Sequence, residues 1–417
     1  MRTKAFIFAG FLALSASAQL PRVQAPTVSV PGIQVPVVPE TARGVTGRLR
    51  ELSGARALRA DRLLSQHRAE LERDAGGDLV IRAEVIAIDI TPEALVLALK
   101  ARFQVRRTRE LPDLAVKITV LQTPAGMSAT RGLKRLRKLD PQGSYDYNHL
   151  YFDGGEVGAS ATVKPGVDAV PRFSGAGRVG LIDGGVDAQH EVFRGIKVHH
   201  SGCEDRVVPS PHGTAVAYLL ISHNGVGEIF AADVYCGEAT GGAMDAVSAA
   251  FGWMAHEQVA VINVSLVGPR NKLMERVVKT LVGRGHLIVA AVGNDGPAAP
   301  PLYPASYDGV IGVTAVDAKH QVLIEACRGK QVDFAAQGAD VSAASNAPDV
   351  FVPVRGTSFA SPIIAAMFAA DLETPDPARV QMAIAKWNGV ANDLGKPGRD
   401  DTYGEGELAP PSGNANK

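Results

Sequence analysis

Cysteine, aromatic residues and net charge are all scarce in this chain. It holds 3 cysteines and 2 tryptophans among 417 residues, aromatic residues make up 6%, and 43 basic side chains balance 43 acidic ones. The cysteines allow at most one disulfide and form no C-x-x-C or His-spaced zinc pattern. The balanced charge argues against nucleic acid or an acidic membrane surface as a partner. Long apolar runs are also missing, because no stretch approaches the roughly 20 residues of a membrane-spanning helix.

The chain does have the means to build a large core. Its hydrophobic content of 46% and charged content of 21% exclude disorder throughout and predict more than one domain. At the N-terminus, Arg2 and Lys4 precede a short apolar run, and Ala16-Ser17-Ala18 is a cleavage site of the A-x-A type. Residues 1–18 are therefore expected to be a secretory signal peptide, with the product exported to the periplasm or the outside.

Composition divides the rest of the chain. Residues 19–44, rich in Pro and Val, are expected to form an extended linker, and residues 45–77 a helical segment with a break near Gly54. The tail, 409–417, is polar and expected to be flexible.

Residues 78–152 alternate between strand and helix patterns. A strand over 78–90 is followed by Thr91-Pro92-Glu93, which has the cap, proline and acid of a helix start. The remaining predicted elements are strands 104–111 and 114–122, a helix with a basic face over 128–139, and an extended segment over 144–152. The order βαββαβ predicts a ferredoxin-like α+β sandwich.

From about residue 170, apolar β-branched runs alternate with helices, which is typical of a parallel sheet covered on both faces. The predicted strands include 179–182, 231–234, 259–264, 287–292 and 310–313, and the predicted helices include 242–257, 272–283 and 363–370.

Two of four motifs supply an acid and a base. Acyl transfer through serine needs a hydroxyl, a base, an acid that orients the base, and donors for the oxyanion. The strand at 179–182 ends in Asp183, and the glycines after it allow another side chain to approach. His212, in Pro-His-Gly-Thr, stands at an expected helix start and is the candidate base.

The other two motifs supply the donor and the nucleophile. A buried strand delivers Asn294 in Gly-Asn-Asp-Gly, where its amide can donate to an oxyanion. Ser358, in Gly-Thr-Ser-Phe-Ala-Ser-Pro, stands before an apolar helix whose N-terminal N–H groups favour negative charge.

Together these four motifs resemble the subtilisin family, in which the acid, the histidine and the serine follow in this order. The resemblance covers about 170–408 and places a peptidase domain at 160–408. It implies an α/β fold with a subtilisin-like, mostly parallel sheet flanked by helices. It also implies a serine endopeptidase that cleaves peptides or proteins through an acyl-enzyme, with Asp183, His212 and Ser358 as the triad and Asn294 as the oxyanion donor.

The resemblance extends to the substrate cleft, where the expected substrate-binding residues are Ser265, Leu266, Val267 and Gly293. Three positions depart from the family pattern. Gly184 replaces a usual Ser or Thr, Ala215 replaces a second His, and Val267 stands where Gly is usual. Val267 is expected to narrow or reshape the pocket for the residue before the cleaved bond.

Residues 78–152 resemble in pattern the propeptide that assists folding of these proteases and then inhibits them. The segment 145–152 is expected to lie in the cleft as a strand, with self-cleavage near residues 152–160. The alternative is a stable additional domain.

Cysteine pairing and metal binding stay open. Cys203 and Cys236 lie on segments that flank His212 and are the favoured disulfide, whereas Cys327 lies in a later loop; three free buried thiols are the alternative. No cofactor is required for the chemistry. Relatives often bind structural calcium, but no carboxylate loop identifies ligands here, so no metal site is assigned. The protein is expected to be a monomer.

Other functions remain as alternatives. A catalytically silent peptide-binding or inhibitory relative would keep the fold, and an esterase would use the same triad. The G-x-G-x-x-G pattern at 175–180 precedes its strand and opens no helix, which excludes a dinucleotide site.

Overall fold

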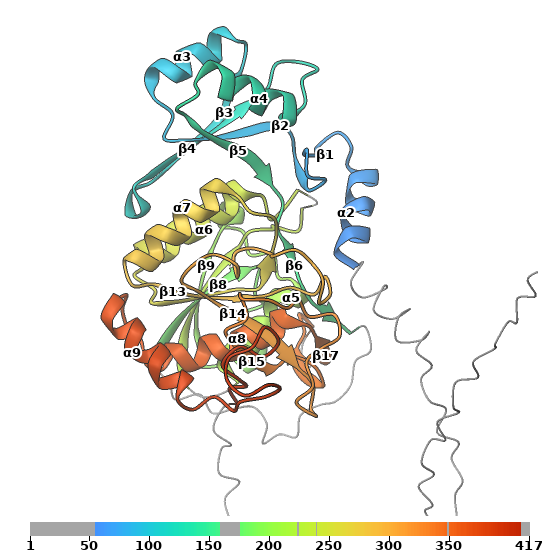
Figure 1. Ribbon diagram of the computed structural model, residues 1–417, viewed down its shortest axis with the longest axis vertical. Helices are drawn as coiled ribbons and strands as arrows, with labels where there is room; N and C mark the ends of the chain where they lie inside the picture. Colours follow the sequence, from blue (N-terminus) through green and yellow to red (C-terminus); the bar gives the residue numbers. More distant parts are fainter. Residues whose placement is uncertain (1–54, 159–175, 223–224, 239, 348–349, 410–417) are drawn as a thin grey trace, which may run out of the picture. The chain divides into compact units, whose positions relative to one another are not determined.

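The computed structural model describes residues 55–158, 176–222, 225–238, 240–347 and 350–409 (Figure 1). The predicted signal peptide, the linker and nearly all of the predicted tail lie outside these residues. Within them, every helix is too short or too polar to cross a membrane.

A seven-stranded sheet forms the centre of the larger domain. Its order is β15-β14-β13-β11-β8-β10-β9, and every neighbouring pair is parallel, which confirms the predicted sheet. The inner strands are buried on both faces, as their β-branched composition requires. The strands are β8 (Gly177–Asp183), β9 (Lys197–Ser201), β10 (Val226–Asp233), β11 (Val261–Val264), β13 (Leu287–Ala291), β14 (Val310–Val316) and β15 (Phe334–Gln337).

Helices cover both faces of this sheet (Figure 1). One apolar core holds side chains of α5 (Pro211–Ile221), α8 (Thr357–Ala369) and α9 (Pro377–Asn388). The other holds those of α6 (Met244–His256) and α7 (Lys272–Gly283). The carboxyl ends of the parallel strands and the first turns of α5 and α8 therefore meet along one edge of the sheet.

Two small antiparallel sheets flank that edge. In one, β6 (Phe152–Asp153) pairs with β12 (Leu266–Val267). In the other, β17 (Phe351–Arg355) pairs with both β16 (Val341–Ala344) and β7 (Glu156–Val157). The chain before residue 158 thus contributes a strand to each sheet.

The smaller domain has the predicted order βαββαβ. Its strands lie antiparallel in the order β3-β4-β2-β5, and α3 and α4 pack their apolar sides over one face. Thr91 caps α3, since its Oγ1 accepts a hydrogen bond of 3.1 Å from the N–H of Ala94. The elements are β2 (Leu79–Ile88), α3 (Pro92–Lys100), β3 (Gln104–Leu111), β4 (Val116–Gln122), α4 (Ala129–Leu139) and β5 (Ser144–His149).

Of the predicted helical segment 45–77, residues 45–54, with the predicted break near Gly54, lie outside the described residues, and the remainder is only partly helical. Helix α2 covers Ala55–Gln66, but Leu71–Arg73 form strand β1, which pairs antiparallel with the start of β2. Leu71 is fully buried there. The available edge of β2 and this burial outweigh the helical pattern of the sequence.

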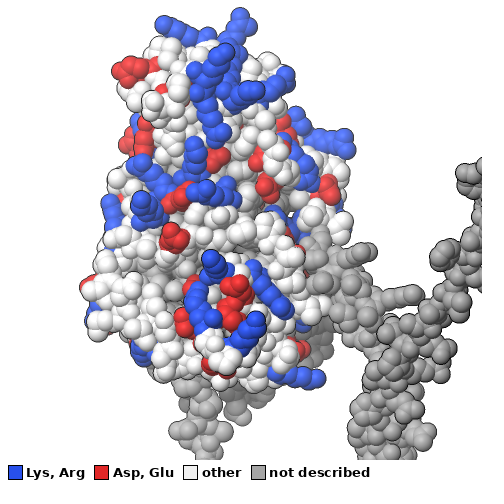
Figure 2. Space-filling model, in the orientation of Figure 1, with Lys and Arg blue, Asp and Glu red and all other residues white. Residues whose placement is uncertain are grey.

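Basic side chains gather on the outer side of α4. The helix carries five exposed Lys or Arg residues and no acid, while its buried residues face the sheet. Figure 2 shows this concentration of blue at the top of the view. The helix is therefore amphipathic, as its sequence predicts.

Polar contacts join the smaller domain to the first turns of α6 and α7. The Asp245 carboxylate accepts hydrogen bonds from Arg107 Nε at 2.6 Å and from Asn148 Nδ2 at 2.8 Å. Asp146 Oδ2 accepts one from the N–H of Lys272 at 2.7 Å, where a negative charge complements the helix dipole. These contacts hold β5 so that the chain continues from it into β6 beside the larger sheet.

Candidate active site

Asp183 and His212 meet at the carboxyl edge of the sheet. Asp183 ends β8, and His212 lies in the first turn of α5, which Ser210 caps by accepting from the N–H of Gly213 at 2.9 Å. His212 Nδ1 lies 2.9 and 3.0 Å from the two Asp183 oxygens. Both side chains are buried, so the carboxylate holds the ring in a fixed orientation.

The charge state of this pair follows from burial and mutual attraction. Burial favours the neutral imidazole, but the Asp183 carboxylate outweighs it and raises the pKa of His212. Burial raises the pKa of Asp183, against the opposing effects of His212 and of the Gly184 N–H. The net effect is that the His212 ring holds a proton more readily than an exposed histidine does.

The departure at Gly184 has a local reason. A Cβ atom added to Gly184 would lie 2.4 Å from Ser210 Oγ and 2.9 Å from Ser210 Cβ. The cap of α5 therefore fills the space that a Ser or Thr side chain at this position would need. Instead of a side-chain hydroxyl, the Gly184 N–H donates to Asp183 Oδ1 at 2.6 Å.

Ser358 lies in the first turn of α8 and precedes Phe359, whose ring centroid lies 5.1 Å from that of His212. Its Oγ donates to the carbonyl of Ser265 at 3.2 Å, and Ser265 Oγ donates back to the Ser358 carbonyl at 2.9 Å. His212 Nε2 is buried and has no hydrogen-bond partner among the described residues. Ser358 Oγ and His212 Nε2 are therefore not hydrogen-bonded to each other in this structure.

Asn294 follows β13 and faces the same point. Its Oδ1 accepts from the N–H of Thr357 at 3.1 Å, which orients the amide, and its Nδ2 donates to the carbonyl of Gly154. A carbonyl oxygen therefore occupies the position where Asn294 would stabilise an oxyanion.

The segment around Gly154 crosses the site between two short strands, β6 before it and β7 after it. Asp153 pairs with Leu266 and Phe152 with Val267 on one side of Gly154, and Glu156 pairs with Arg355 on the other. A Cβ atom added to Gly154 would lie 3.3 Å from Ser358 Oγ and 3.6 Å from Asn294 Nδ2. The peptide bond between Gly154 and Gly155 is thus presented to Ser358.

A buried tyrosine anchors this segment. Tyr151 is fully buried; its hydroxyl donates to the carbonyl of Pro269 at 2.8 Å, and its own carbonyl accepts from the Tyr235 hydroxyl at 3.1 Å. Its ring lies against Gly268.

The four residues expected to bind substrate occupy different places. Leu266 and Val267 pair with the segment through their backbones. The Ser265 hydroxyl is occupied by the Ser358 carbonyl at 2.9 Å and by Ser361 Oγ at 3.1 Å, so it contacts α8 instead of the segment around Gly154. Gly293 lies against Leu302 and the Cys327 sulfur.

Helix α2 adds two residues that the sequence analysis does not identify. Arg59 forms an ion pair with Asp153, and Arg56 pairs with Asp295 at 2.7 Å. They border a cavity of about 130 Å³ that Gly154 and Val267 also line. No local pattern marks these arginines, because their partners are 94 and 239 residues away in the chain.

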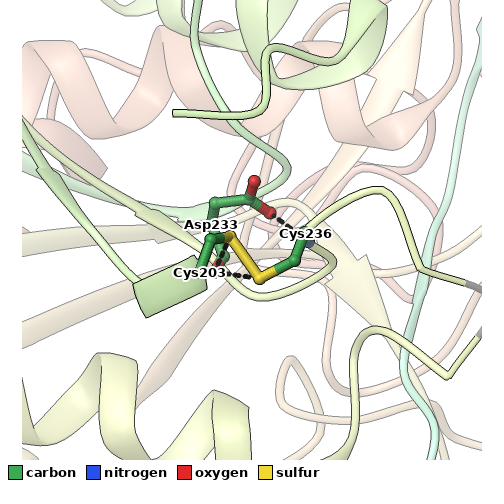
Figure 3. A group of neighbouring side chains, drawn as sticks. All are labelled: Cys203, Asp233 and Cys236. Atoms are coloured by element: carbon green, nitrogen blue, oxygen red, sulfur yellow. Dashed lines mark hydrogen bonds between the residues drawn. A yellow bond between two sulfur atoms is a disulfide. The ribbon is translucent and has the colours of Figure 1, made fainter. Parts of the chain in front are cut away.

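Two of the cysteines lie beside Asp233, the last residue of β10 (Figure 3). Cys203 and Cys236, the pair favoured from the sequence, are joined by a disulfide, and Asp233 Oδ1 accepts from the N–H of Cys236 at 2.9 Å. Cys327 is a free thiol, and burial raises its pKa to about 12.

The one cluster of three possible metal ligands among the described residues is Cys203, Asp233 and Cys236, and its two sulfur atoms are already bonded to each other. Calcium binding stays a prediction without ligands.

Comparison with known sequences now identifies the class of protein. Residues 176–406 match the subtilase family, Peptidase S8, which is more than half of the chain. The chain belongs to the subtilase family, and the resemblance to subtilisin-like peptidases is confirmed.

Two individual relatives named as a protease or a subtilisin are similar to this chain in sequence. The minor extracellular protease Epr of Bacillus subtilis is 32% identical over 207 residues, which is 47% of this chain and 32% of that protein. Subtilisin DY of Bacillus licheniformis is 30% identical over 45% of this chain and 73% of its own length. The match to Epr therefore spans only about a third of that relative.

The fold is shared with fervidolysin from Fervidobacterium pennivorans, described as a keratinolytic enzyme related to subtilisin. The two structures superpose with a TM-score of 0.65 at 19% identity, over 79% of this chain and 60% of that one. The family match, 176–406, is little more than half of the chain, whereas the structural match covers 79% of it. The similarity in fold therefore includes much of the region before residue 176.

Proposed function

We propose that this protein is an exported serine endopeptidase, made as a precursor that cleaves itself between Gly154 and Gly155. The observation that carries the proposal is the Gly154 carbonyl held by Asn294 beside Ser358. It narrows the predicted processing region, 152–160, to one bond.

The geometry supports a complete reaction. Ser358 Oγ attacks the Gly154 carbonyl carbon while His212 Nε2 takes the hydroxyl proton, and Asn294 Nδ2 with the Ser358 N–H stabilises the oxyanion. His212 then gives the proton to the Gly155 nitrogen as the peptide bond breaks. Water, activated by His212, hydrolyses the resulting ester between Ser358 and Gly154. No step needs a cofactor.

The smaller domain would act as the inhibitor and folding aid. Strand β6 fills the side of the cleft along β12, and the Asp245 and Asp146 contacts secure the domain to the helix starts. The cleft would open to other peptides only after this domain leaves. Peptide and protein substrates of the processed enzyme would then pair with β12 as β6 does.

Export is part of the proposal. It rests on the signal-like residues 1–18, which lie outside the described residues, and on Epr, whose name describes it as extracellular.

Labelling and N-terminal sequencing test the proposal. The processed protein is expected to react with a fluorophosphonate probe and to begin at Gly155. A mature protein that begins at Gln19 would contradict self-processing. Failure of a correctly processed protein to label would instead favour the silent peptide-binding alternative, and ester turnover without cleavage of denatured protein would favour an esterase.

Activity should rise with pH through the pKa of His212. Only neutral imidazole accepts the Ser358 proton. Burial lowers the pKa of His212, but Asp183 outweighs burial and raises it. The rising limb of kcat/KM, measured with a peptide that has no titratable group, should therefore have its midpoint above the usual histidine value. A midpoint at or below that value would contradict the assignment.

A further inference from the structure

The residue on the leaving side of the bond, Gly155, has no space for a side chain. A Cβ atom added to it would lie 2.4 Å from Cε2, 3.1 Å from Cδ2 and 3.2 Å from Cζ of Phe359. These distances are below ordinary carbon–carbon contact, so even a methyl group requires the ring or the peptide to move.

The Phe359 ring is poorly placed to move. Phe359 follows Ser358 in α8 and is fully buried in the apolar core that also holds side chains of α5 and α9. Its ring centroid lies 5.1 Å from that of His212, with the ring planes at 50°. A shift of the ring would therefore disturb the base, and accommodation of a larger residue would come at the expense of catalysis.

The position before the bond is less restricted. A Cβ atom added to Gly154 would lie 3.8 Å from Val267 Cγ2, an ordinary contact, although it would be 3.3 Å from Ser358 Oγ. A small residue fits here. The stricter selection therefore acts on the leaving side.

We infer that Phe359 makes this enzyme selective for glycine directly after the cleaved bond, an inference that rests on the proposed function. Its substrates are peptides and proteins with an accessible bond between a small residue and glycine. Phe359 is then a specificity-determining residue, and the enzyme's own Gly154–Gly155 junction is one example of the class.

A matched peptide series tests the selectivity. The quenched fluorescent peptide Leu-Tyr-Phe-Asp-Gly-Gly-Glu-Val-Gly, the sequence of residues 150–158, is compared with versions that carry Ala or Leu in place of the second Gly. The processed wild-type protein should show kcat/KM lower by about tenfold for Ala and about a hundredfold for Leu. Replacement of the following Glu by Leu is the control and should change kcat/KM little, because Glu156 is exposed.

Variants of Phe359 assign the effect to its ring. Phe359→Ala should reduce the Gly-to-Leu preference at least tenfold, whatever its absolute rate, and Phe359→Met keeps the test available if the alanine variant does not fold. In the full chain, Gly155→Leu should slow self-processing, and Phe359→Ala should restore it in the same chain.

Two outcomes overturn the inference in distinguishable ways. Equal cleavage of the Gly and Leu peptides, or an unchanged preference in the Phe359 variants, would overturn the selectivity alone. Absence of both fluorophosphonate labelling and cleavage of every peptide would overturn the proposed function and the inference with it.

Discussion

Replacement of Ser358 by alanine should leave the precursor uncut between Gly154 and Gly155. The variant lacks the oxygen that attacks Gly154, while Asp183 and His212 remain in place. The expected loss in kcat is about 10⁶-fold, a magnitude that comes from subtilisin itself and not from this geometry. Electrophoresis with N-terminal sequencing of the purified chain measures the processing, and a fluorophosphonate probe measures the loss of the nucleophile.

Ser361→Ala is the matched control for this variant. Ser361 lies one turn further along α8, is equally buried, and contacts Ser265 Oγ at 3.1 Å. It should keep both labelling and processing. Self-cleavage of purified Ser358→Ala at the wild-type rate would show that another group attacks Gly154.

The parallel sheet could be predicted because its inner strands satisfy a demanding condition. Runs such as 287–292 are apolar on both faces, and few other structures use such sequences. Strand β9 has no such run and could not be predicted from the sequence. It lies at the sheet edge, its sequence Lys-Val-His-His-Ser is polar, and its pairing with β10 is visible only in three dimensions.

The candidate site also contains some residues that the sequence predicts and others that it does not. The predicted triad residues and Asn294 stand in local motifs at strand and helix ends, so the topology alone brings them to one edge of the sheet. The role of Phe359 depends on its distance from Gly155, and the pairing of Arg59 depends on Asp153. Contacts between segments so far apart in the chain leave no periodic pattern, and sequence reasoning therefore could not find them.

Replacement of Asp183 by asparagine should leave the fold intact and remove most of the activity. Asp183 Oδ1 accepts from the Gly184 N–H at 2.6 Å, so an asparagine would keep its oxygen there and turn its NH₂ group toward His212 Nδ1. Nδ1 would then have to accept a hydrogen bond, which places the ring proton on Nε2. In that tautomer His212 cannot take the proton of Ser358.

The expected loss in kcat is about 10⁴-fold, the magnitude found for the acid of such triads, including that of subtilisin itself. Asp233→Asn is the matched control, since Asp233 ends the neighbouring strand β10 in register with Asp183 and is also buried. Its Oδ1 accepts only backbone N–H groups, of Tyr235 and Cys236, so an asparagine keeps these contacts and should retain activity within a few-fold. Equal losses of kcat in the two variants would mean that both carboxylates act through the stability of the folded protein. A loss of kcat confined to Asp183→Asn, with unchanged thermal unfolding, assigns the effect to the tautomer of His212.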